Sequence, residues 1–343
     1  MGAGMTDRTT LSAPSTQPFD AALHEQLAQR FPAQPVPPAP SGAAAGSALH
    51  LYHAANSICS QKVRAVLAQL GRAYQSHSIE IFRGENYDPL YVKLRAGGCA
   101  AAGLPLAVTH PGSTAVEVGG CDACVVPTLV DSAHGRVMVD SRRICEDLCR
   151  TGAEATSLIP ESLASRIADE LAIIDNLPNY QLLAIGVGHA APGELPNGFA
   201  RGKVARCDSM IEAHAGDEVL EAAYGAKRAK EQMAAEQLFD EASVASAYRT
   251  MAQAIDGLQQ RLGAGGNYLL GNAMNLADIF WAVELVRFED LGMAVLWQGV
   301  RRPAVARYYQ ALLQEPAIQQ AVLRWPGARL PRRPEVPLQV FGE

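Results

Sequence analysis

The spacing of apolar residues changes once along this chain, and that change limits what it can fold into. Between Leu49 and Arg150, short alternating or apolar runs are interleaved with helical patterns. From Pro160 onward, nearly every apolar stripe recurs with the period of an α-helix, about 3.6 residues. A mixed α/β part followed by an all-helical part is therefore predicted. The 343 residues are enough for two domains of ordinary size.

The α/β part is predicted to follow the order β-α-β-α-β-β-α. The helix after the first strand has Ser57 as its N-cap and Gly71 as its stop. The predicted strands are 49–54, 74–81, 125–131 and 136–140, and the predicted helices are 57–70, 87–95 and 141–150.

We divide the chain into an extension at 1–47, an α/β domain at 48–152, a helical domain at 158–330 and a tail at 331–343. The extension is rich in Pro, Ala, Ser and Thr, which favours a flexible linker behind one short helix at 19–29. A Gly-, Ala- and Cys-rich insertion at 96–124 interrupts the α/β domain. So long a loop in a compact domain is either functional or disordered.

The helical domain is predicted to contain six helices with apolar stripes, and a break at 193–198 separates the first from the rest. The expected helices are 161–177, 217–239, 243–262, 275–288, 303–314 and 316–325. Asn275 and Asp278 form a capping box at the start of the most apolar of them. We assign Asp278 a structural role.

Charge and composition exclude several classes of partner. The net charge is -6 with no dense basic stripe, so no nucleic-acid partner is expected. No apolar run approaches the roughly 20 residues of a membrane span, and no apolar signal core follows the N-terminus, so a cytoplasmic location is expected. Seven cysteines, an odd number, favour reduced thiols over a disulfide framework. Cys121 and Cys124 form a lone CxxC whose spacing to Cys99 and His110 fits no zinc finger, so no metal is predicted.

Cys59 lies in the first turn of the helix that follows the first predicted strand. The free N–H groups and the positive dipole end of a helix start favour the thiolate, which is the nucleophilic form of cysteine. The N-cap Ser57 can also donate a hydrogen bond to a sulfur anion. Ser57 and Cys59 are therefore candidate catalytic residues, and the competing interpretation is a small residue that merely starts a helix.

Two further segments are candidates for binding a peptide-like ligand. Val126-Pro127 begins a strand, and a cis bond there would turn the Val126 N–H and C=O outward to pair with a ligand. Asp140-Ser141 stands at a helix start, where backbone N–H groups and a hydroxyl form an anion site suited to a carboxylate. A plain edge proline and a simple N-cap explain the same residues, so both interpretations stay open.

Other polar residues are given ordinary roles. His53 is interpreted as a packed strand residue, and Cys145 and Cys149 as small buried side chains. Four residues of the helical domain could line a second-substrate pocket or be ordinary helix surface or core: Tyr180, Lys227, Lys230 and Arg287.

Four motifs occur in an order that resembles the glutathione-transferase superfamily. They are the strand–SICS–helix element at 49–70, VPTLVD at 126–131, DS at 140–141 and NLADIFWA at 275–282. Within that superfamily, SICS together with ENYDPLYVKLR (85–95) and a terminal WPG (325–327) resembles the chlorinated-hydroquinone reductive dehalogenases. The resemblance implies a thioredoxin-like N-terminal domain, a helical C-terminal domain, glutathione as cofactor and a homodimer.

The resemblance also implies a reaction, the reductive removal of halide from a small halogenated hydroquinone with two glutathiones. Cys59 would take the glutathionyl group and Ser57 would assist. The predicted glutathione site consists of Val126, Pro127, Asp140 and Ser141. The run CSQKVR (59–64) is also similar to the CSxRVR of zeta-class maleylacetoacetate isomerases, so a transferase or isomerase that uses Ser57 is the alternative. A non-enzymatic glutathione-binding interaction module is the third hypothesis.

Overall fold

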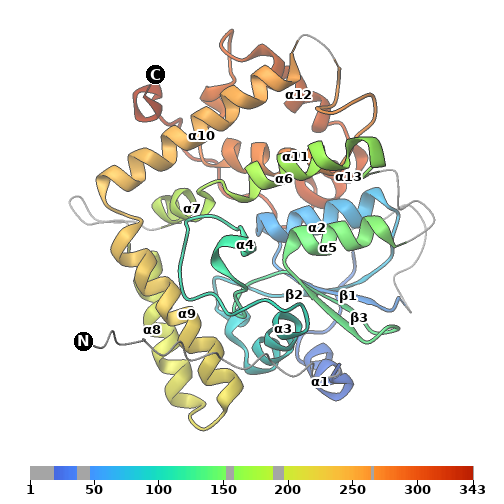
Figure 1. Ribbon diagram of the computed structural model, residues 1–343, viewed down its shortest axis with the longest axis vertical. Coiled ribbons are helices and arrows are strands. Elements are labelled where there is room, and N and C mark those ends of the chain that lie inside the picture. Colours follow the sequence, from blue (N-terminus) through green and yellow to red (C-terminus); the bar gives the residue numbers. More distant parts are fainter. Residues whose placement is uncertain (1–18, 37–46, 152–157, 188–196, 264–265, 343) are drawn as a thin grey trace, which may run out of the picture.

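A computed structural model describes residues 19–36, 47–151, 158–187, 197–263 and 266–342 of the chain. Within these residues, a four-stranded sheet with flanking helices is followed by a helical half (Figure 1). None of the described helices is both long and apolar enough to cross a membrane. The predicted fold class, α/β plus all-α, is confirmed.

The sheet has the spatial order β2-β1-β3-β4. Strand β1 pairs in parallel with β2 and antiparallel with β3, and β3 forms a hairpin with β4. This is the predicted thioredoxin-like arrangement. Its strands are β1 (Leu49–His53), β2 (Gln75–Ser78), β3 (Thr128–Asp131) and β4 (Arg136–Val139), and its helices are α2 (Ile58–Gln69), α3 (Pro89–Ala101) and α5 (Ser141–Arg150).

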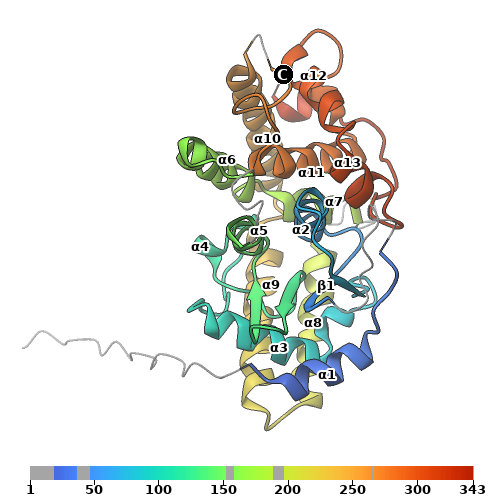
Figure 2. The same ribbon diagram turned by 90° about the vertical axis from the view of Figure 1, so that its right-hand side faces the viewer.

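Successive side chains of the central strands point to opposite faces, which separates two layers of helices. Leu51 and Leu129 belong to the core that α2 and α5 share with the helical half. Tyr52 and Val130 belong to a second core with α3. Figure 2 shows α2 and α5 on one side of the sheet and α3 on the other, with α1 (Ala21–Arg30) beside α3.

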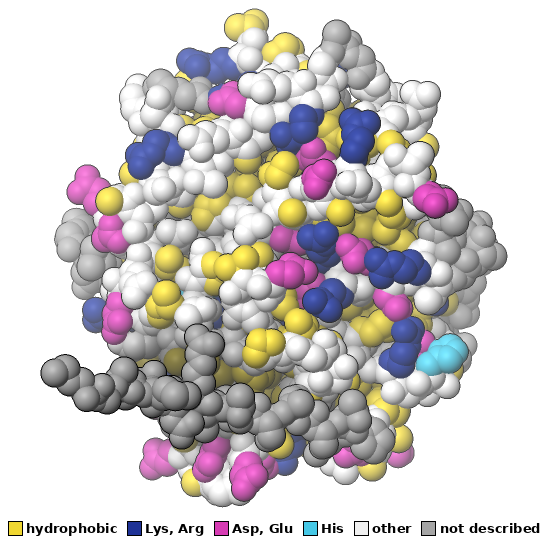
Figure 3. Space-filling model, in the orientation of Figure 1, with side chains coloured by type: hydrophobic (Ala, Val, Ile, Leu, Met, Phe, Trp, Pro, Cys, Tyr) yellow, Lys and Arg dark blue, Asp and Glu magenta, His cyan; other side chains and the backbone are white. Residues whose placement is uncertain are grey.

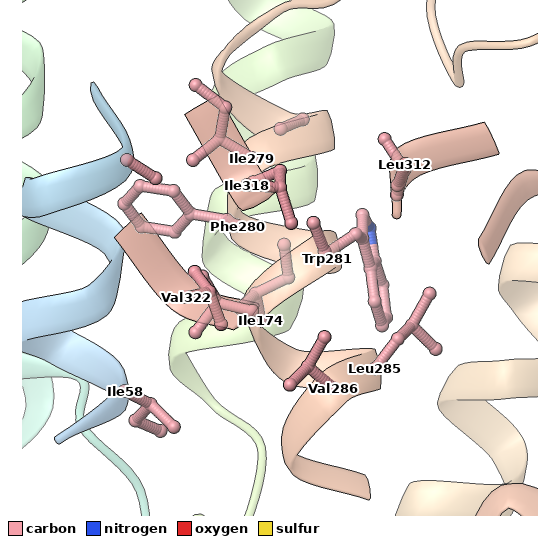
Figure 4. Packing of buried hydrophobic residues seen from close by; sticks show 14 of the residues in the cluster. Ile58, Ile174, Ile279, Phe280, Trp281, Leu285, Val286, Leu312, Ile318 and Val322 are labelled. Atoms are coloured by element: carbon pink, nitrogen blue, oxygen red, sulfur yellow. The ribbon is translucent and has the colours of Figure 1, made fainter. Parts of the chain in front are cut away.

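The helical half is built around α11 (Leu276–Asp290), whose residues are nearly all buried. Figure 4 shows Trp281 and Leu285 of α11 on the side of Leu312, while Phe280 points toward α2. The capping box of Asn275 and Asp278 is confirmed. The surrounding helices are α6 (Ala164–Asp175), α7 (Asn179–Val187), α8 (Gly198–Ala213), α9 (Glu218–Gln237), α10 (Glu241–Leu262), α12 (Pro303–Leu312) and α13 (Pro316–Ile318), the last continued by the π-turn η4 (Gln319–Leu323).

Arg64 on α2 joins the α/β part to the end of the helical part. Its guanidinium donates to the carbonyl oxygen of Ala321 from Nε at 3.1 Å and from Nη2 at 3.0 Å. It also lies 4.5 Å from the ring centroid of Trp325. The two parts of the chain therefore share one interface in which α2 is covered by η4 and α11.

Part of the N-terminal extension packs against the fold and is not a linker. The predicted short helix is present as α1, where Leu27 is fully buried against the α3 core. His24 of α1 packs edge-on to His50 of β1, with ring centroids 4.6 Å apart. The rest of the predicted linker, 1–18 and 37–46, lies outside the described residues.

The insertion at 96–124 corrects two predictions. It is not one long irregular loop, because α3 continues to Ala101 and a short helix, α4 (Val116–Gly119), follows. The longer α3 brings Cys99 within 6.0 Å of Cys121 between Cα atoms, and the two form a disulfide. The expectation that the cysteines are all reduced thiols is therefore wrong for this pair, because residues 22 positions apart meet only once α3 is extended.

In the helical half, α7 and α8 were not predicted from the sequence. The buried residues of α8 are small or short, namely Ala200, Val204 and Cys207, and they make a weak apolar stripe. Helix α8 packs along α9 instead of on the central core. The predicted break at 193–198 lies largely outside the described residues.

Candidate functional site

The strand register brings the starts of α2 and α5 and the end of the loop before β3 together at one end of the strands. Tyr52 near the end of β1 pairs with Thr128 at the start of β3, and Thr128 pairs with Val139 at the end of β4. The segments next to these three paired residues, which follow β1, precede β3 and follow β4, are therefore neighbours. They carry the six predicted site residues: Ser57, Cys59, Val126, Pro127, Asp140 and Ser141.

Cys59 lies in the first turn of α2, and its side chain is half-buried. Ser141, the first residue of α5, is the serine whose side chain lowers the pKa of the Cys59 thiol. Ser57 caps α2, since its Oγ accepts from the Ser60 N–H at 3.3 Å. The predicted N-cap is thus confirmed, and a second serine, which local sequence spacing does not pair with Cys59, acts on the sulfur.

The environment of Cys59 differs from the one predicted from the helix start alone. Burial raises the pKa of the Cys59 thiol, and the nearby carboxylates of Asp140 and Asp175 raise it further. The cation of Lys62 and the hydrogen bond from Ser141 oppose this effect. The thiolate that a helix start alone favours is therefore opposed here, because desolvating the sulfur anion raises the Cys59 pKa.

The Val126–Pro127 peptide bond is cis. Val126 is buried, yet among the described residues none hydrogen-bonds to its backbone N–H or C=O. Buried backbone groups are normally paired, so these two are suited to a partner that presents an extended peptide. The next carbonyl, that of Pro127, accepts from Arg95 and is already occupied.

The segment before Pro127 is held by side chains that were not predicted to have a role in the site. Arg95 on α3 donates to the carbonyls of Asp122 and Pro127 and, at 3.0 Å, to Thr128 Oγ1. The Tyr91 hydroxyl donates to the Val125 carbonyl at 2.7 Å. In the sequence, these roles are indicated only by two polar side chains, Tyr91 and Arg95, on the buried face of α3.

Asp140 is the one residue other than glycine, among those described, with a positive φ, 70°. A positive φ costs a residue that has a side chain about 1–3 kcal/mol, and Asn and Asp adopt it more readily than other residues. The Asp140 side chain repays part of this cost, since its Oδ1 accepts from the Arg143 N–H at 3.0 Å and caps α5. This sharp turn from β4 into α5 brings Ser141 to the sulfur of Cys59.

Arg287 of α11 also reaches this region. It is buried and donates from Nη2 to the carbonyl of Asn56, the residue before the α2 cap. Its Nε has no hydrogen-bond partner among the described residues. Of the four residues considered for a second-substrate pocket, Arg287 is the one that the structure joins to the Ser57–Cys59 turn.

The other three residues belong to a separate buried cluster. Lys227 and Lys230 of α9 lie 2.7 Å and 3.0 Å from Asp122 Oδ2. The Tyr180 hydroxyl donates to Glu231, which also pairs with Lys227. These groups connect the insertion to α9.

His53, Cys145 and Cys149 are core residues, as predicted. His53 Nε2 lies 2.8 Å from Ser76 Oγ, its Nδ1 lies 3.1 Å from Arg64, and it is buried. Both cysteines are buried in the core under α5.

A groove of about 1070 Å³ runs along edge strand β4 between α3 and α5, and it contains none of the six predicted site residues. Its charges largely satisfy one another, as in Arg142–Glu146 at 3.0 Å and Arg136–Asp147 at 3.1 Å. Figure 3 shows such alternating basic and acidic side chains on the face that carries α5. The groove is therefore distinct from the Cys59 region.

Comparison with known families and proteins identifies the family to which the chain belongs. Residues 56–151 match the family described as glutathione S-transferase, N-terminal domain, and residues 236–311 match glutathione S-transferase, C-terminal domain. The chain is 35% identical over 286 residues to the 2,5-dichlorohydroquinone reductive dechlorinase of Sphingobium indicum, covering 81% of this chain and 83% of that protein. It is 25% identical to the tetrachloro-p-hydroquinone reductive dehalogenase of Sphingobium chlorophenolicum, covering 81% of this chain and 97% of that protein.

Among solved structures, the beta-etherase LigF from Sphingobium sp. strain SYK-6 is similar in fold. Its TM-score is 0.53 at 14% sequence identity, covering 80% of this chain and 98% of that chain. At this identity the likeness concerns the fold alone.

Proposed function

This chain belongs to the glutathione S-transferase family, and from that premise we propose that it is a glutathione-dependent enzyme that removes halide from halogenated hydroquinones. The observation that carries the proposal is the thiol of Cys59 at the start of α2, whose pKa the side chain of Ser141 at the start of α5 lowers. A thiol at this position can take part in disulfide exchange, which a serine cannot. The relative at 35% identity is named for reductive dechlorination of a dihalogenated hydroquinone.

The residues around Cys59 fit glutathione. The unpaired N–H and C=O of Val126 can pair with its peptide backbone, and the cis Pro127 follows directly. The start of α5 at Asp140 and Ser141 offers free N–H groups to a carboxylate. We therefore assign glutathione binding to these four residues.

The proposed reaction uses two glutathiones and balances as follows. The first glutathione thiolate displaces halide from the ring and leaves an aryl thioether. The Cys59 thiolate then attacks the thioether sulfur, the ring carbon takes a proton, and Cys59 becomes disulfide-bonded to glutathione. A second glutathione thiolate attacks that disulfide, which frees Cys59 and yields glutathione disulfide. The ring gains two electrons, and the two glutathiones lose them.

The test is halide release by a Cys59→Ser variant. We expect halide release to stop while glutathione binding, measured by calorimetry, stays close to normal, because binding rests on Val126 and the α5 start. Mass spectrometry of the native protein with glutathione and a chlorohydroquinone should show one glutathione on Cys59. A Cys149→Ala variant, which removes a buried thiol of α5, is the control and should keep turnover.

Three outcomes would redirect the assignment. Full halide release by Cys59→Ser would refute the disulfide mechanism. Turnover of a maleyl-type substrate that depends on Ser57 and not on Cys59 would favour the isomerase. Glutathione binding without turnover of any electrophile would favour the interaction module.

We further propose that the protein is a cytoplasmic homodimer with the domain division given above. Family membership supports the dimer, and the consumption of two reduced glutathiones in the proposed reaction supports the compartment. Light scattering at micromolar concentration should give twice the 36.5 kDa mass of one chain. The mass of one chain would refute the dimer.

A further inference from the structure

Lys62 is a fully buried cation one helical turn after Cys59. Positions i and i+3 of a helix lie on one face, with Cβ atoms about 5–6 Å apart. The Lys62 ammonium lies 2.9 Å from Glu284 Oε1 of α11 and 4.0 Å from Asp175 Oδ1 of α6. It also lies 4.7 Å from the ring centroid of Phe280, the side chain that points toward α2 in Figure 4.

A buried ion pair such as Lys62–Glu284 is not explained by stability. Both side chains are fully buried, and taking two charges out of water costs about as much as their attraction returns. A well-packed apolar pair would hold α2 against α11 equally well. The positive charge of Lys62 therefore needs an explanation other than stability, such as an electrostatic effect on a neighbouring group.

The charged groups around Cys59 come from four elements. Helix α2 contributes Lys62, α5 begins after Asp140, α6 contributes Asp175, and α11 contributes Glu284 and Arg287. The segments α13 and η4, which also pack on α2, contain no charged side chain. Three carboxyl groups thus face two cations.

The two cations are not equivalent. Arg287 directs Nη2 to the Asn56 carbonyl, whereas Lys62 is the largest influence that opposes the raised pKa of Cys59. Glu284 and Asp175 in turn raise the pKa of Lys62, which keeps it charged despite its burial. Asp175 is itself shared with Arg142 of α5, at 3.7 Å.

We propose that Lys62 is a positioning residue whose anchored ammonium stabilises the Cys59 sulfur as a thiolate, both as attacking group and as the group released from the mixed disulfide. This rests on the proposed function, since it supplies what disulfide exchange at Cys59 requires. The release step is balanced: the second glutathione thiolate forms a bond to the glutathione sulfur, and Cys59 leaves with the electron pair. Glu284 sets how strongly the ammonium acts on the sulfur.

The test compares two substitutions that act in opposite directions. Lys62→Met removes the cation, and the Glu284 it leaves behind takes up a proton. An opposite charge within about 4–6 Å shifts a pKa by roughly 1–3 units, so the pH profile of Cys59 alkylation should move up by about one unit or more. Glu284→Gln removes a carboxylate and leaves Lys62 charged beside Asp175, so the profile should move down.

The measurement is the rate of iodoacetamide addition to Cys59 across pH, located by peptide mass spectrometry on the full chain. At pH 7, Lys62→Met should react about tenfold or more slowly, since only the thiolate reacts. Lys203→Met, which removes a half-buried lysine of α8 paired with Glu231, should leave the profile unchanged. Should Lys62→Met fail to fold, Glu284→Gln alone still tests the sign.

The proposal is overturned if the Lys62 and Glu284 variants move the profile in the same direction or leave it in place, which is what a purely structural pair would do. Alkylation does not require turnover. If Cys59→Ser still releases halide, the dehalogenase mechanism fails, but the pH profile of Cys59 alkylation still tests the role of Lys62.

Discussion

Replacing Ser141 by alanine should impair Cys59 more than replacing Ser57, although Ser57 is closer in sequence. The Ser141 side chain lowers the pKa of Cys59, as a hydroxyl that donates to the thiolate does, whereas Ser57 Oγ accepts from the Ser60 N–H. A hydrogen bond to a charged group contributes about 1.5–3 kcal/mol. At about 1.4 kcal/mol per unit, losing it raises the Cys59 pKa by roughly one to two units.

The consequence is measurable without substrate. Below the pKa, the thiolate fraction falls about tenfold per unit, so Ser141→Ala should react with iodoacetamide at pH 7 about ten- to a hundredfold more slowly. Its helix should stay capped, because Asp140 accepts from Arg143 and not from Ser141. Ser57→Ala should instead lower the free energy of unfolding by about 0.5–2 kcal/mol, the usual worth of an N-cap.

Denaturant titration and alkylation of the two variants separate these effects. The reasoning is refuted if Ser57→Ala shifts the alkylation profile and Ser141→Ala does not. That result would place the Ser57 hydroxyl on the sulfur, as the sequence alone suggested, and would return Ser141 to the role of an ordinary first residue of α5.

Three further outcomes are expected. Arg95→Met should lower the free energy of unfolding by about 3–5 kcal/mol in urea titration and weaken glutathione binding in calorimetry, because buried carbonyls lose a charged donor. Cys99→Ala with Cys121→Ala should cost about 3 kcal/mol of stability by the same titration, as expected for opening a closed loop of 22 residues. Burial, with His24 and His77 nearby, lowers the pKa of His50 to about 4, so the unfolded chain binds more protons between pH 6.5 and 4. Stability should fall as the pH drops through that window, and a melting series with His50→Gln should show a smaller fall.

The elements that the sequence predicted are those whose signal is local. The alternating runs that became β1 and β3, and the stripe and cap of α2, depend on neighbours within one element. The extended α3 depends on a distant contact instead. A Cβ at Gly98 would lie 2.8 Å from Val137 of β4, so glycine lets α3 approach the sheet closely. The same Gly- and Ala-rich composition is typical of a loop when only the sequence is considered.

The same distinction explains the candidate site. Cys59, Ser57 and Pro127 could be proposed from residue type and position, because a helix start and a strand start are visible in the sequence. The approach of Ser141 to Cys59 follows from a register across three strands, and Lys62–Glu284 follows from the packing of α2 on α11. Neither register nor packing between distant helices is encoded in local spacing.

The segment that carries Val126 is held from both halves of the molecule. Asp122 Oδ1 accepts from the Cys124 N–H at 2.8 Å, and Asp122 Oδ2 pairs with Lys227 and Lys230 of α9. The Cys124 carbonyl accepts from Asn86, beside α3. Because Val126 lies two residues beyond Cys124, the position of its free N–H and C=O depends on α9 as well as on the sheet. The two lysines considered for a substrate pocket thus fix the geometry of the proposed glutathione site, which makes the insertion a structural part of that site.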